Sequence, residues 1–276
     1  MSPDDPYWEK CARHQNRSTS RFVAHLFLCQ NCANRLRHEC LNDRAPLFVG
    51  LPVDGYCGLC NVAQRVLLYQ WFICQICLNV ILSYTKSFAA SKTLREFWQQ
   101  SILPLQPKSR LEETEVVALE PFVPGKRNKD KAVKTLDFSV YDDSLKTHGP
   151  IFFIEMKAGP GSIDEMKQFQ LDINDSNDIA TVCNREGIPA YVFHVQVGEE
   201  YYPPTRRAVG KAIWWTDAFT LEHNLLYVKR RRGEDKDAGY YSPKAFKGVE
   251  GFLNELKSNR YSLLKQKLAK TPLLQR

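Results

Sequence analysis

The chain has 276 residues, of which 43% are hydrophobic and 25% charged, a composition that excludes intrinsic disorder and fibrous repeats. Its length fits one or two domains. The first residues hold no apolar signal core, and polar residues (Gln70, Gln75 and Asn79) interrupt the most apolar stretch, 66–83, so we expect a cytoplasmic protein with reduced cysteines and no membrane span.

The net charge of +7 is unevenly distributed along the chain. Residues 1–100 hold 11 basic and 7 acidic side chains, residues 101–200 hold 11 and 17, and residues 201–276 hold 16 and 7. Basic flanks suit a polyanion such as DNA or RNA, and local carboxylates suit hard metal ions. A chain with solvated charged faces and a basic tail would have the same balance.

The first third of the chain contains eight of the nine cysteines. Seven of them and one histidine form pairs with two intervening residues: Cys11 with His14, Cys29 with Cys32, Cys57 with Cys60, and Cys74 with Cys77. Two such pairs complete one tetrahedral Zn²⁺ site, and a site with four protein ligands is structural. Taken in order, the first two pairs form one site and the last two form a second, which predicts two zinc ions.

Other pairings of these ligands remain open. Four pairs also allow an interleaved topology, as in cross-braced RING-like modules of the ubiquitin system, and His38 or Cys40 could replace a ligand. Ordinary buried thiols are the alternative without metal. We expect residues 1–85 to form this zinc-binding module, whose partner is DNA or another protein.

Residues 86–107 are predicted to form a helical connector. Leu94, Phe97 and Trp98 have helical spacing within 88–102, and Ser91 is a candidate N-cap. The helix is expected to end before Leu103-Pro104, because the residue before a proline disfavours the helical conformation. The remaining chain, 108–276, is then the second domain.

Two strands are predicted in the acidic middle of the chain. In residues 134–141 apolar and polar side chains alternate, so Asp137 points to the opposite face from its apolar neighbours. Residues 151–157 place Glu155 and Lys157 on one face of the second strand. A polar loop between them fits a hairpin, which would bring Asp137 beside Glu155. Two carboxylates on rigid strands bind Mg²⁺, and a lysine beside them can orient water and offset negative charge during phosphodiester hydrolysis.

These residues resemble the PD-(D/E)xK nuclease superfamily, which includes many restriction endonucleases. The matching segments are TLDFSVY, with Asp137, and FFIEMKAG, with Glu155 and Lys157. The resemblance implies that Asp137 and Glu155 are magnesium ligands and that Lys157 is the catalytic lysine of the motif. Leu136 stands where the name-giving pattern has proline. The implied fold is α/β, a restriction-endonuclease-like core with a mixed β-sheet flanked by helices.

The segment after Lys157 is predicted to continue this core. Ser162 and Glu165 form a capping box for a helix, which carries an apolar stripe at 163, 166, 169 and 173. Residues 188–197 then predict a strand, in which His194 is interpreted as a buried strand residue. The superfamily often adds an upstream acidic residue to its metal site, and Glu113 is our choice among Glu112, Glu113, Glu115 and Glu120.

The basic carboxyl-terminal region mixes cations with aromatic residues, as a nucleic-acid face does. The run Lys229–Arg232 is followed by GEDKD, so a solvated loop explains it equally well. Trp214 and Trp215 are expected to point to opposite sides of a strand, and residues 244–258 are predicted to form an amphipathic closing helix.

Together these observations predict a magnesium-dependent endonuclease that cleaves double-stranded DNA, with two structural zinc ions. The leading hypothesis is sequence-specific cleavage of the type II restriction kind, since the chain has no G-x-x-x-x-G-K-[ST] motif for ATP. A homodimer is a further hypothesis, drawn from the resemblance. The alternatives are a structure-directed nuclease of repair or transposition and a non-catalytic, zinc-containing DNA-binding protein.

Overall fold

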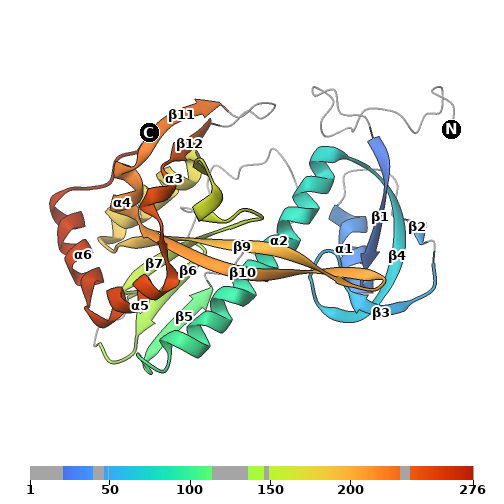
Figure 1. Ribbon diagram of the computed structural model, residues 1–276, viewed down its shortest axis with the longest axis horizontal. Helices are drawn as coiled ribbons and strands as arrows, with labels where there is room; N and C mark the ends of the chain where they lie inside the picture. The colour runs from blue at the N-terminus through green and yellow to red at the C-terminus, as the bar shows by residue number, and fades with distance from the viewer. Residues whose placement is uncertain are drawn as a thin grey trace. The chain divides into compact units, whose positions relative to one another are not determined.

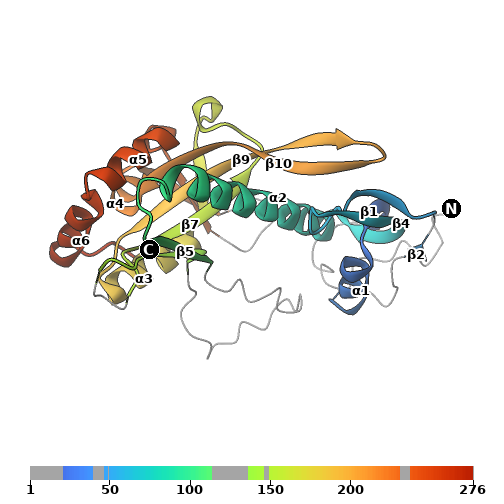
Figure 2. The same ribbon diagram turned by 90° about the horizontal axis from the view of Figure 1, so that it is seen from below.

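The computed structural model describes residues 21–39, 47–48, 50–113, 136–145, 149–230 and 237–275. The chain divides into two compact units. Unit 1 comprises residues 1–89, 117–129 and 198–209, and unit 2 comprises residues 90–116, 130–197 and 210–276. Figures 1 and 2 show the elements of both units.

Unit 1 is a small β-sheet with one short helix beside it. Its elements are β1 (Arg21–Leu28), α1 (Gln30–Glu39), β2 (Leu47–Phe48), β3 (Val53–Tyr56) and β4 (Ala63–Cys74). The long strand β4 is central: β1 pairs with its carboxyl-terminal part, from Leu28 opposite Leu67 to Arg21 opposite Cys74, and β3 pairs with its beginning. Strand β2 also pairs with β4, and all three pairings are antiparallel.

Helix α2 (Gln75–Phe97) follows β4 directly, so the apolar stretch 66–83 is shared between a strand and a helix. Ser91 therefore lies inside the helix, and its predicted role as N-cap is wrong. The chain continues as a π-helical turn (Trp98–Ile102) and leaves the helix before Pro104, as the proline predicts. Among the described helices, none is long and apolar enough to cross a membrane.

Unit 2 contains a six-stranded mixed sheet in the order β13-β10-β9-β7-β6-β5. Strands β6 and β7 form the predicted hairpin, β5 pairs antiparallel with β6, and β7 and β9 are parallel. The sheet strands are β5 (Ser109–Glu113), β6 (Phe138–Asp142), β7 (Phe152–Gly159), β9 (Ala190–Tyr202), β10 (Thr205–Asp217) and β13 (Lys247–Gly248).

Each face of this sheet is covered by its own apolar core. One core contains Phe153 and Val192 of the sheet with residues of α3 (Ile173–Glu186) and α4 (Ala218–His223). The other contains Phe152 and Ile154 of the sheet with residues of α2 and α5 (Val249–Lys257). Trp214 belongs to the first core and Trp215 to the second, which confirms that the two indoles point to opposite sides of β10.

The helix predicted to start after Ser162 begins later than expected. The Ser162 hydroxyl accepts a hydrogen bond from the Asp164 N–H, but only a single 3₁₀ turn (Ile163–Glu165) follows. The chain then forms β8 (Phe169–Asp172) before α3 begins at Ile173. Strand β8 pairs with β12 (Asp237–Tyr241), about 70 residues downstream, and local sequence periodicity carries no trace of such a long-range pairing.

Strands β8, β12 and β11 (Leu225–Arg230) form a separate three-stranded sheet in the order β11-β12-β8. After β12, a 3₁₀ turn (Pro243–Ala245) and β13 precede α5, so the predicted closing helix starts at 249 and not at 244. A last helix, α6 (Arg260–Lys270), follows α5.

The β9-β10 hairpin ends in a tip, residues 198–209, that belongs to unit 1. Thr205 of the tip accepts a hydrogen bond at its hydroxyl from the Tyr56 N–H (2.9 Å) and lies so close to Gly55 that a Cβ there would overlap it. The Asn61 side chain donates to the Ala208 carbonyl and accepts from the Ala208 N–H, both at 2.8 Å. These contacts fix the tip against the turn between β3 and β4.

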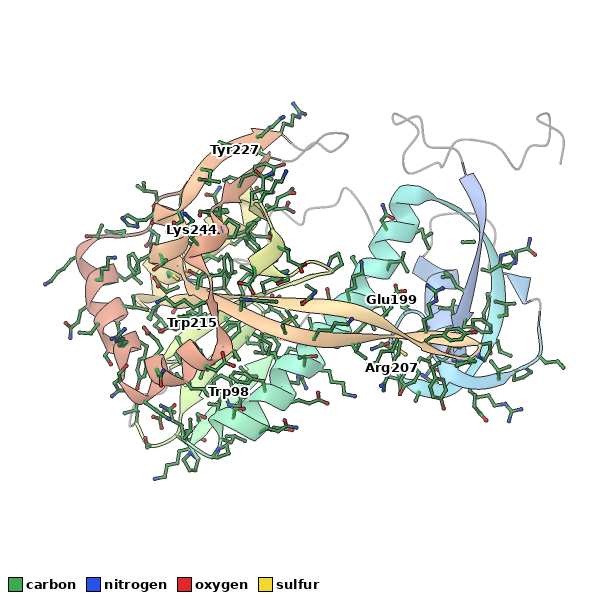
Figure 3. All side chains as sticks on the ribbon, viewed as in Figure 1. Trp98, Glu199, Arg207, Trp215, Tyr227 and Lys244 are labelled. Atoms are coloured by element: carbon green, nitrogen blue, oxygen red, sulfur yellow. The ribbon has the colours of Figure 1, made fainter. Side chains whose placement is uncertain are left out.

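Arg207 adds a charged contact to the same tip. Its guanidinium pairs with Glu200 across the hairpin, donates to the Tyr56 hydroxyl and lies over the Tyr56 ring (Figure 3 labels Arg207 and the neighbouring Glu199).

Candidate active site and metal centre

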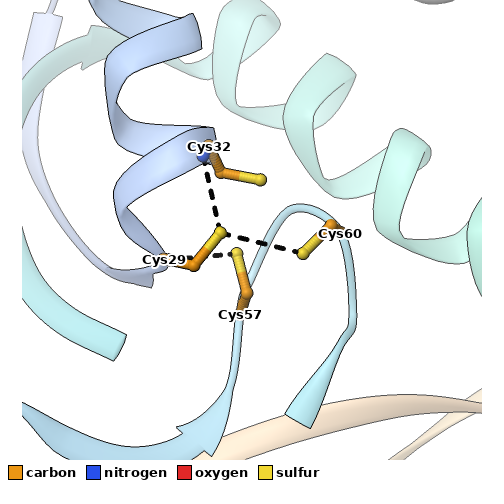
Figure 4. Close-up of side chains that lie close together, drawn as sticks. All are labelled: Cys29, Cys32, Cys57 and Cys60. Atoms are coloured by element: carbon orange, nitrogen blue, oxygen red, sulfur yellow. Dashed lines mark hydrogen bonds between the residues drawn. The ribbon is translucent and has the colours of Figure 1, made fainter. Parts of the chain in front are cut away.

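Four cysteines of unit 1 form a compact group, which we call the four-cysteine cluster. The sulfur atoms of Cys29, Cys32, Cys57 and Cys60 all lie within 4.8 Å of one another, and Figure 4 shows them converging from two turns. The first pair lies where β1 ends and α1 begins, and the second lies in the turn between β3 and β4. The Gly58 N–H donates to the Phe27 carbonyl (2.7 Å), which joins the two turns.

The hydrogen bonds of the cluster favour a thiolate at Cys57. The Cys29 N–H points to the Cys57 sulfur (3.3 Å) and the Cys32 N–H to the Cys29 sulfur (3.5 Å). Hydrogen bonds from the Cys32 and Cys60 thiols, together with backbone N–H groups, lower the pKa of Cys57, whereas donation to Cys57 and burial raise the pKa of Cys32 and of Cys60. A thiolate is the form of cysteine that binds metal.

The donor set fits zinc. With Zn–S bonds of about 2.3 Å, the sulfurs of a tetrahedral site lie about 3.8 Å apart, and the Cys29 and Cys60 sulfurs are 4.0 Å apart. Four thiolates would fill all four positions, so the site is closed to substrate. The chain therefore contains a four-cysteine cluster that can bind a zinc-like metal.

The predicted grouping of the cysteine pairs is wrong: the first two pairs do not form one site, and the last two do not form another. The second and third pairs share one site, because the end of β1 and the β3-β4 turn both lie beside the first half of β4. Cys11, His14 and Cys40 lie outside the described residues, and the structure describes only the backbone at His38, Cys74 and Cys77.

A second group of polar side chains lies in unit 2, on one face of the six-stranded sheet. The Lys157 ammonium contacts the Glu155 carboxylate (2.6 Å) and the Asp175 carboxylate (2.8 Å). Glu155 and Lys157 alternate with Ile154 and Met156 along β7, so they point to the face that packs against α3. Asp175 comes from the first turn of α3.

Asp137 lies at the same place in the sheet. It immediately precedes β6, whose Phe138 is opposite Ile154, so the register brings Asp137 next to Glu155. Its carboxylate accepts a hydrogen bond from the Met156 N–H (2.7 Å), which fixes it against the middle of β7. The hairpin predicted from sequence thus does bring the two acids together.

Glu113 points elsewhere. It is opposite Phe138 in the β5-β6 ladder, and Phe138 belongs to the core beneath α2. Its carboxylate forms an ion pair with Arg95 and accepts a hydrogen bond from the Ser91 hydroxyl, both on α2. Strand alternation therefore places Glu113 on the opposite face of the sheet from Glu155 and Lys157. The fourth side chain of the group is Asp175 instead.

Asp175 was not predicted as a site residue because the start of helix α3 was predicted too early in the sequence. A helix running from Ser162 would give residue 175 a position in its fourth turn, far from β7. Once β8 is recognised, Asp175 falls in the first turn of α3, immediately beside the strand end. The available signal was the acid-rich stretch DINDSND, which suits the start of a helix.

The electrostatics of the group are dominated by burial and opposite charge. Glu155 is only 1% exposed. Burial opposes the charged form of Lys157, but the carboxylates of Glu155 and Asp175 outweigh this effect and raise its pKa. The lysine is therefore protonated at neutral pH, and its charge links an acid of the sheet, Glu155, to an acid of α3, Asp175.

His194 lies next to this group, but its side chain makes its contacts with other parts of the protein. It is opposite Lys157 in the parallel β7-β9 ladder, and its Nε2 is 2.9 Å from the Gly161 carbonyl. Phe169 and Trp214 contact its ring. Burial lowers its pKa, so it is a neutral, buried strand residue, as interpreted from sequence.

A hollow in unit 2 lies on the other face of the sheet. It has a volume of about 320 Å³ and is lined by Arg95, Trp98, Arg110 and Glu113, among others. Neither Glu155 nor Lys157 lines it, so it is separate from the acid-lysine group.

Comparison with known proteins gives a structural likeness but no family. No family model matches the chain, and no curated protein matches it. A solved structure titled as D212, a nuclease from a fusselovirus, is similar over 63% of this chain and 89% of its own, with 13% sequence identity and a TM-score of 0.33.

Proposed function

We propose that the chain is a magnesium-dependent DNA endonuclease whose active site consists of Asp137, Glu155, Lys157 and Asp175. The observation that carries the proposal is the convergence of three acids and one lysine from three elements on one face of the sheet, in unit 2. A salt bridge that only stabilises the fold needs one carboxylate for each lysine. Here a single ammonium contacts two carboxylates, and a third lies beside them.

The donor set fits a hard divalent cation. Carboxylate oxygens are what Mg²⁺ binds in proteins, and Asp137 and Glu155 are the proposed ligands, with Asp175 as a third acid. When bound, the ion polarises the scissile phosphate and lowers the pKa of a water ligand.

The protein contributes position and charge. The hydrogen bond from Met156 orients Asp137, and burial together with the contact to Lys157 restricts the Glu155 side chain. We assign Lys157 to stabilising negative charge on the phosphate and orienting the attacking water, because its ammonium lies directly beside the carboxylates of the site.

The zinc site is proposed to be structural. Its four cysteines would fill the coordination positions of the ion, and the second cysteine pair lies in the turn that carries Asn61, which binds the hairpin tip. A second zinc ion, bound by the remaining pairs Cys11-His14 and Cys74-Cys77, stays a prediction from their spacing. We also retain a homodimer as a proposal, because one active site cuts one strand and double-stranded cleavage needs two.

The proposal is tested by incubating the protein with Mg²⁺ and a long, defined duplex DNA. The wild type is expected to cleave it. Discrete bands would identify a sequence-specific enzyme of the type II restriction kind, and structure-dependent cuts a repair or transposition nuclease. Lys157→Ala and Asp137→Ala are expected to lower the cleavage rate by about 10³-fold, because the first removes a positive charge beside the phosphate and the second removes a proposed magnesium ligand.

Matched controls are available on exposed surfaces of the chain. Lys265→Ala on α6 and Asp54→Ala on β3 change the same residue types where both are exposed, and both should cleave like the wild type. Undiminished cleavage by the Lys157 and Asp137 variants would show that this site is wrong. A wild type that binds DNA but never cuts it would favour a non-catalytic DNA-binding protein.

A further inference from the structure

The three-stranded sheet beside the acid-lysine group presents an aromatic and basic surface. Its register places Tyr227, Tyr240 and Gln170 in one row across the three strands, and Lys229, Ala238 and Asp172 in the next row toward the active site. Residues two apart on a strand share a face, so both rows lie on one surface. We call this surface, defined by Tyr227, Tyr240, Gln170 and Lys229, the tyrosine face.

Two aromatic rings are stacked on the tyrosine face. The Tyr227 and Tyr240 rings lie 4.7 Å apart with an angle of 22° between their planes. The Tyr227 hydroxyl donates to the Gln168 side chain (2.7 Å), which fixes the ring in place. Tyr227 is nevertheless 44% exposed and lies on the edge strand β11 (Figure 3), so the stack is open on its outer side.

Positive charge lies beside the stack. Lys229 is exposed and follows Tyr227 on the same face, and the exposed Arg230 is the next residue of β11. Lys229 stands two strands from Asp172, which is a separation of about 10 Å at ordinary strand spacing. Asp172 is the N-cap of α3, three residues before Asp175, so the row that begins at Lys229 ends close to the acid-lysine group.

We infer that the tyrosine face binds an unpaired stretch of the substrate strand next to the bond that is cut. A nucleic-acid base can stack on the outer ring of a rigid, exposed aromatic pair, and the cation beside the pair can contact the neighbouring phosphate. In a duplex the faces of the bases are covered, and only their edges and phosphates are accessible. The inference rests on the proposed function and favours its structure-directed form.

The test measures binding separately from cleavage. Fluorescence anisotropy without added Mg²⁺, so that the DNA is not cleaved and the zinc site is left intact, is used with three DNA probes: a single strand, a blunt duplex, and a duplex with a single-stranded overhang. Tyr227→Ala is expected to weaken binding of the single strand and the overhang about tenfold and to leave the blunt duplex within about twofold. Lys229→Ala should lower the salt dependence of single-strand binding by about 0.7 in log-log slope.

Conservative and matched variants keep the result interpretable. Tyr227→Phe retains the ring and should bind like the wild type, as should Tyr201→Ala, which removes an exposed tyrosine of the hairpin tip, and Lys257→Ala on α5. The inference is overturned if Tyr227→Ala binds all probes normally, if it weakens all of them equally, or if light scattering shows that it alters self-association. Failure of the proposed function would instead appear as a wild type that binds these probes but cuts none of them.

Discussion

The two polar centres of this protein are constructed in opposite ways. The four-cysteine cluster comes from two short sequence motifs, each of which places two ligands in one turn, and its four thiol groups bring no compensating cation of their own. The acid-lysine group comes from single residues at the ends or middles of different elements, and it contains its own cation, Lys157.

This difference determines what each centre needs in order to fold. Clustered thiolates repel one another, so we expect the four-cysteine cluster to need a metal ion for its stability, as structural zinc sites do. The acids of unit 2 are neutralised in part by Lys157, so the fold around them forms without an added ion. We therefore expect metal removal to affect the two units unequally.

The largest effect expected from this comparison is the loss of unit 1 in Cys57→Ser. The variant should lose the zinc ion of the cluster, and peptides from residues 21–39 and 50–74 should lose protection in hydrogen-exchange mass spectrometry. Peptides from β7 and from residues 190–197 of β9, which belong to unit 2, should stay protected. Elemental analysis of the wild type should give two zinc ions per chain if the predicted second site exists, and one if it does not.

Cys183→Ala provides the matched control for the cysteine variant. Cys183 is fully buried in the core of unit 2, away from the cluster, so its replacement should leave the zinc content unchanged. Loss of protection in both units of Cys57→Ser would show that the two centres are not independent.

The contrast also explains what could be predicted from the sequence. Cysteine pairs and the E-x-K motif are local, so the ligand types, the β6-β7 hairpin and the position of Asp137 beside Glu155 were all predictable. Pair partners depend on strand pairing over long distances, so the division of cysteines between sites was mispredicted. Glu113 failed for a similar reason, since the face on which it lies depends on the register of β5.

A second, smaller effect is expected on the stability of unit 2. Lys157→Met leaves the buried Glu155 and the partly buried Asp175 without their cation and should lower the free energy of unfolding by about 3 kcal/mol. Because the folded state raises the pKa of Lys157, its contribution should be complete below about pH 10, the value for an unpaired lysine. It should decline as the pH rises through the higher folded pKa.

The measurement is urea denaturation of both proteins at several pH values between about 7 and 11, a range that spans the titration of an unpaired lysine. The difference in stability should be constant up to about pH 10 and shrink above it. A variant as stable as the wild type at neutral pH would contradict the idea that Lys157 balances the acids.

Asp175 and Glu113 give a direct comparison of two acids on opposite faces of the sheet. Asp175→Asn removes a charge that contacts Lys157, and we expect its cleavage rate to fall by about 10- to 100-fold, since positioning of the lysine is lost. Glu113→Gln breaks the ion pair with Arg95 and should leave the cleavage rate within about twofold of the wild type. The opposite ranking would restore Glu113 to the active site.

The smallest expected effect concerns the turn that links the four-cysteine cluster to the hairpin tip. Asn61 has a left-handed backbone conformation (φ of 54°), which asparagine tolerates better than most residues, and its amide makes both hydrogen bonds to Ala208. Asn61→Ala should cost about 2 kcal/mol of local stability, since it leaves two backbone groups unpaired and strains the turn.

The change should appear as faster hydrogen exchange in residues 198–209 with the zinc content unchanged. Asn34→Ala is the control, because Asn34 is exposed on α1 and its side chain accepts a hydrogen bond from Gln30 of the same helix. Zinc loss in Asn61→Ala would contradict this expectation. It would show that zinc binding depends on the contact between the hairpin tip and the cysteine turn, and not that the contact depends on zinc.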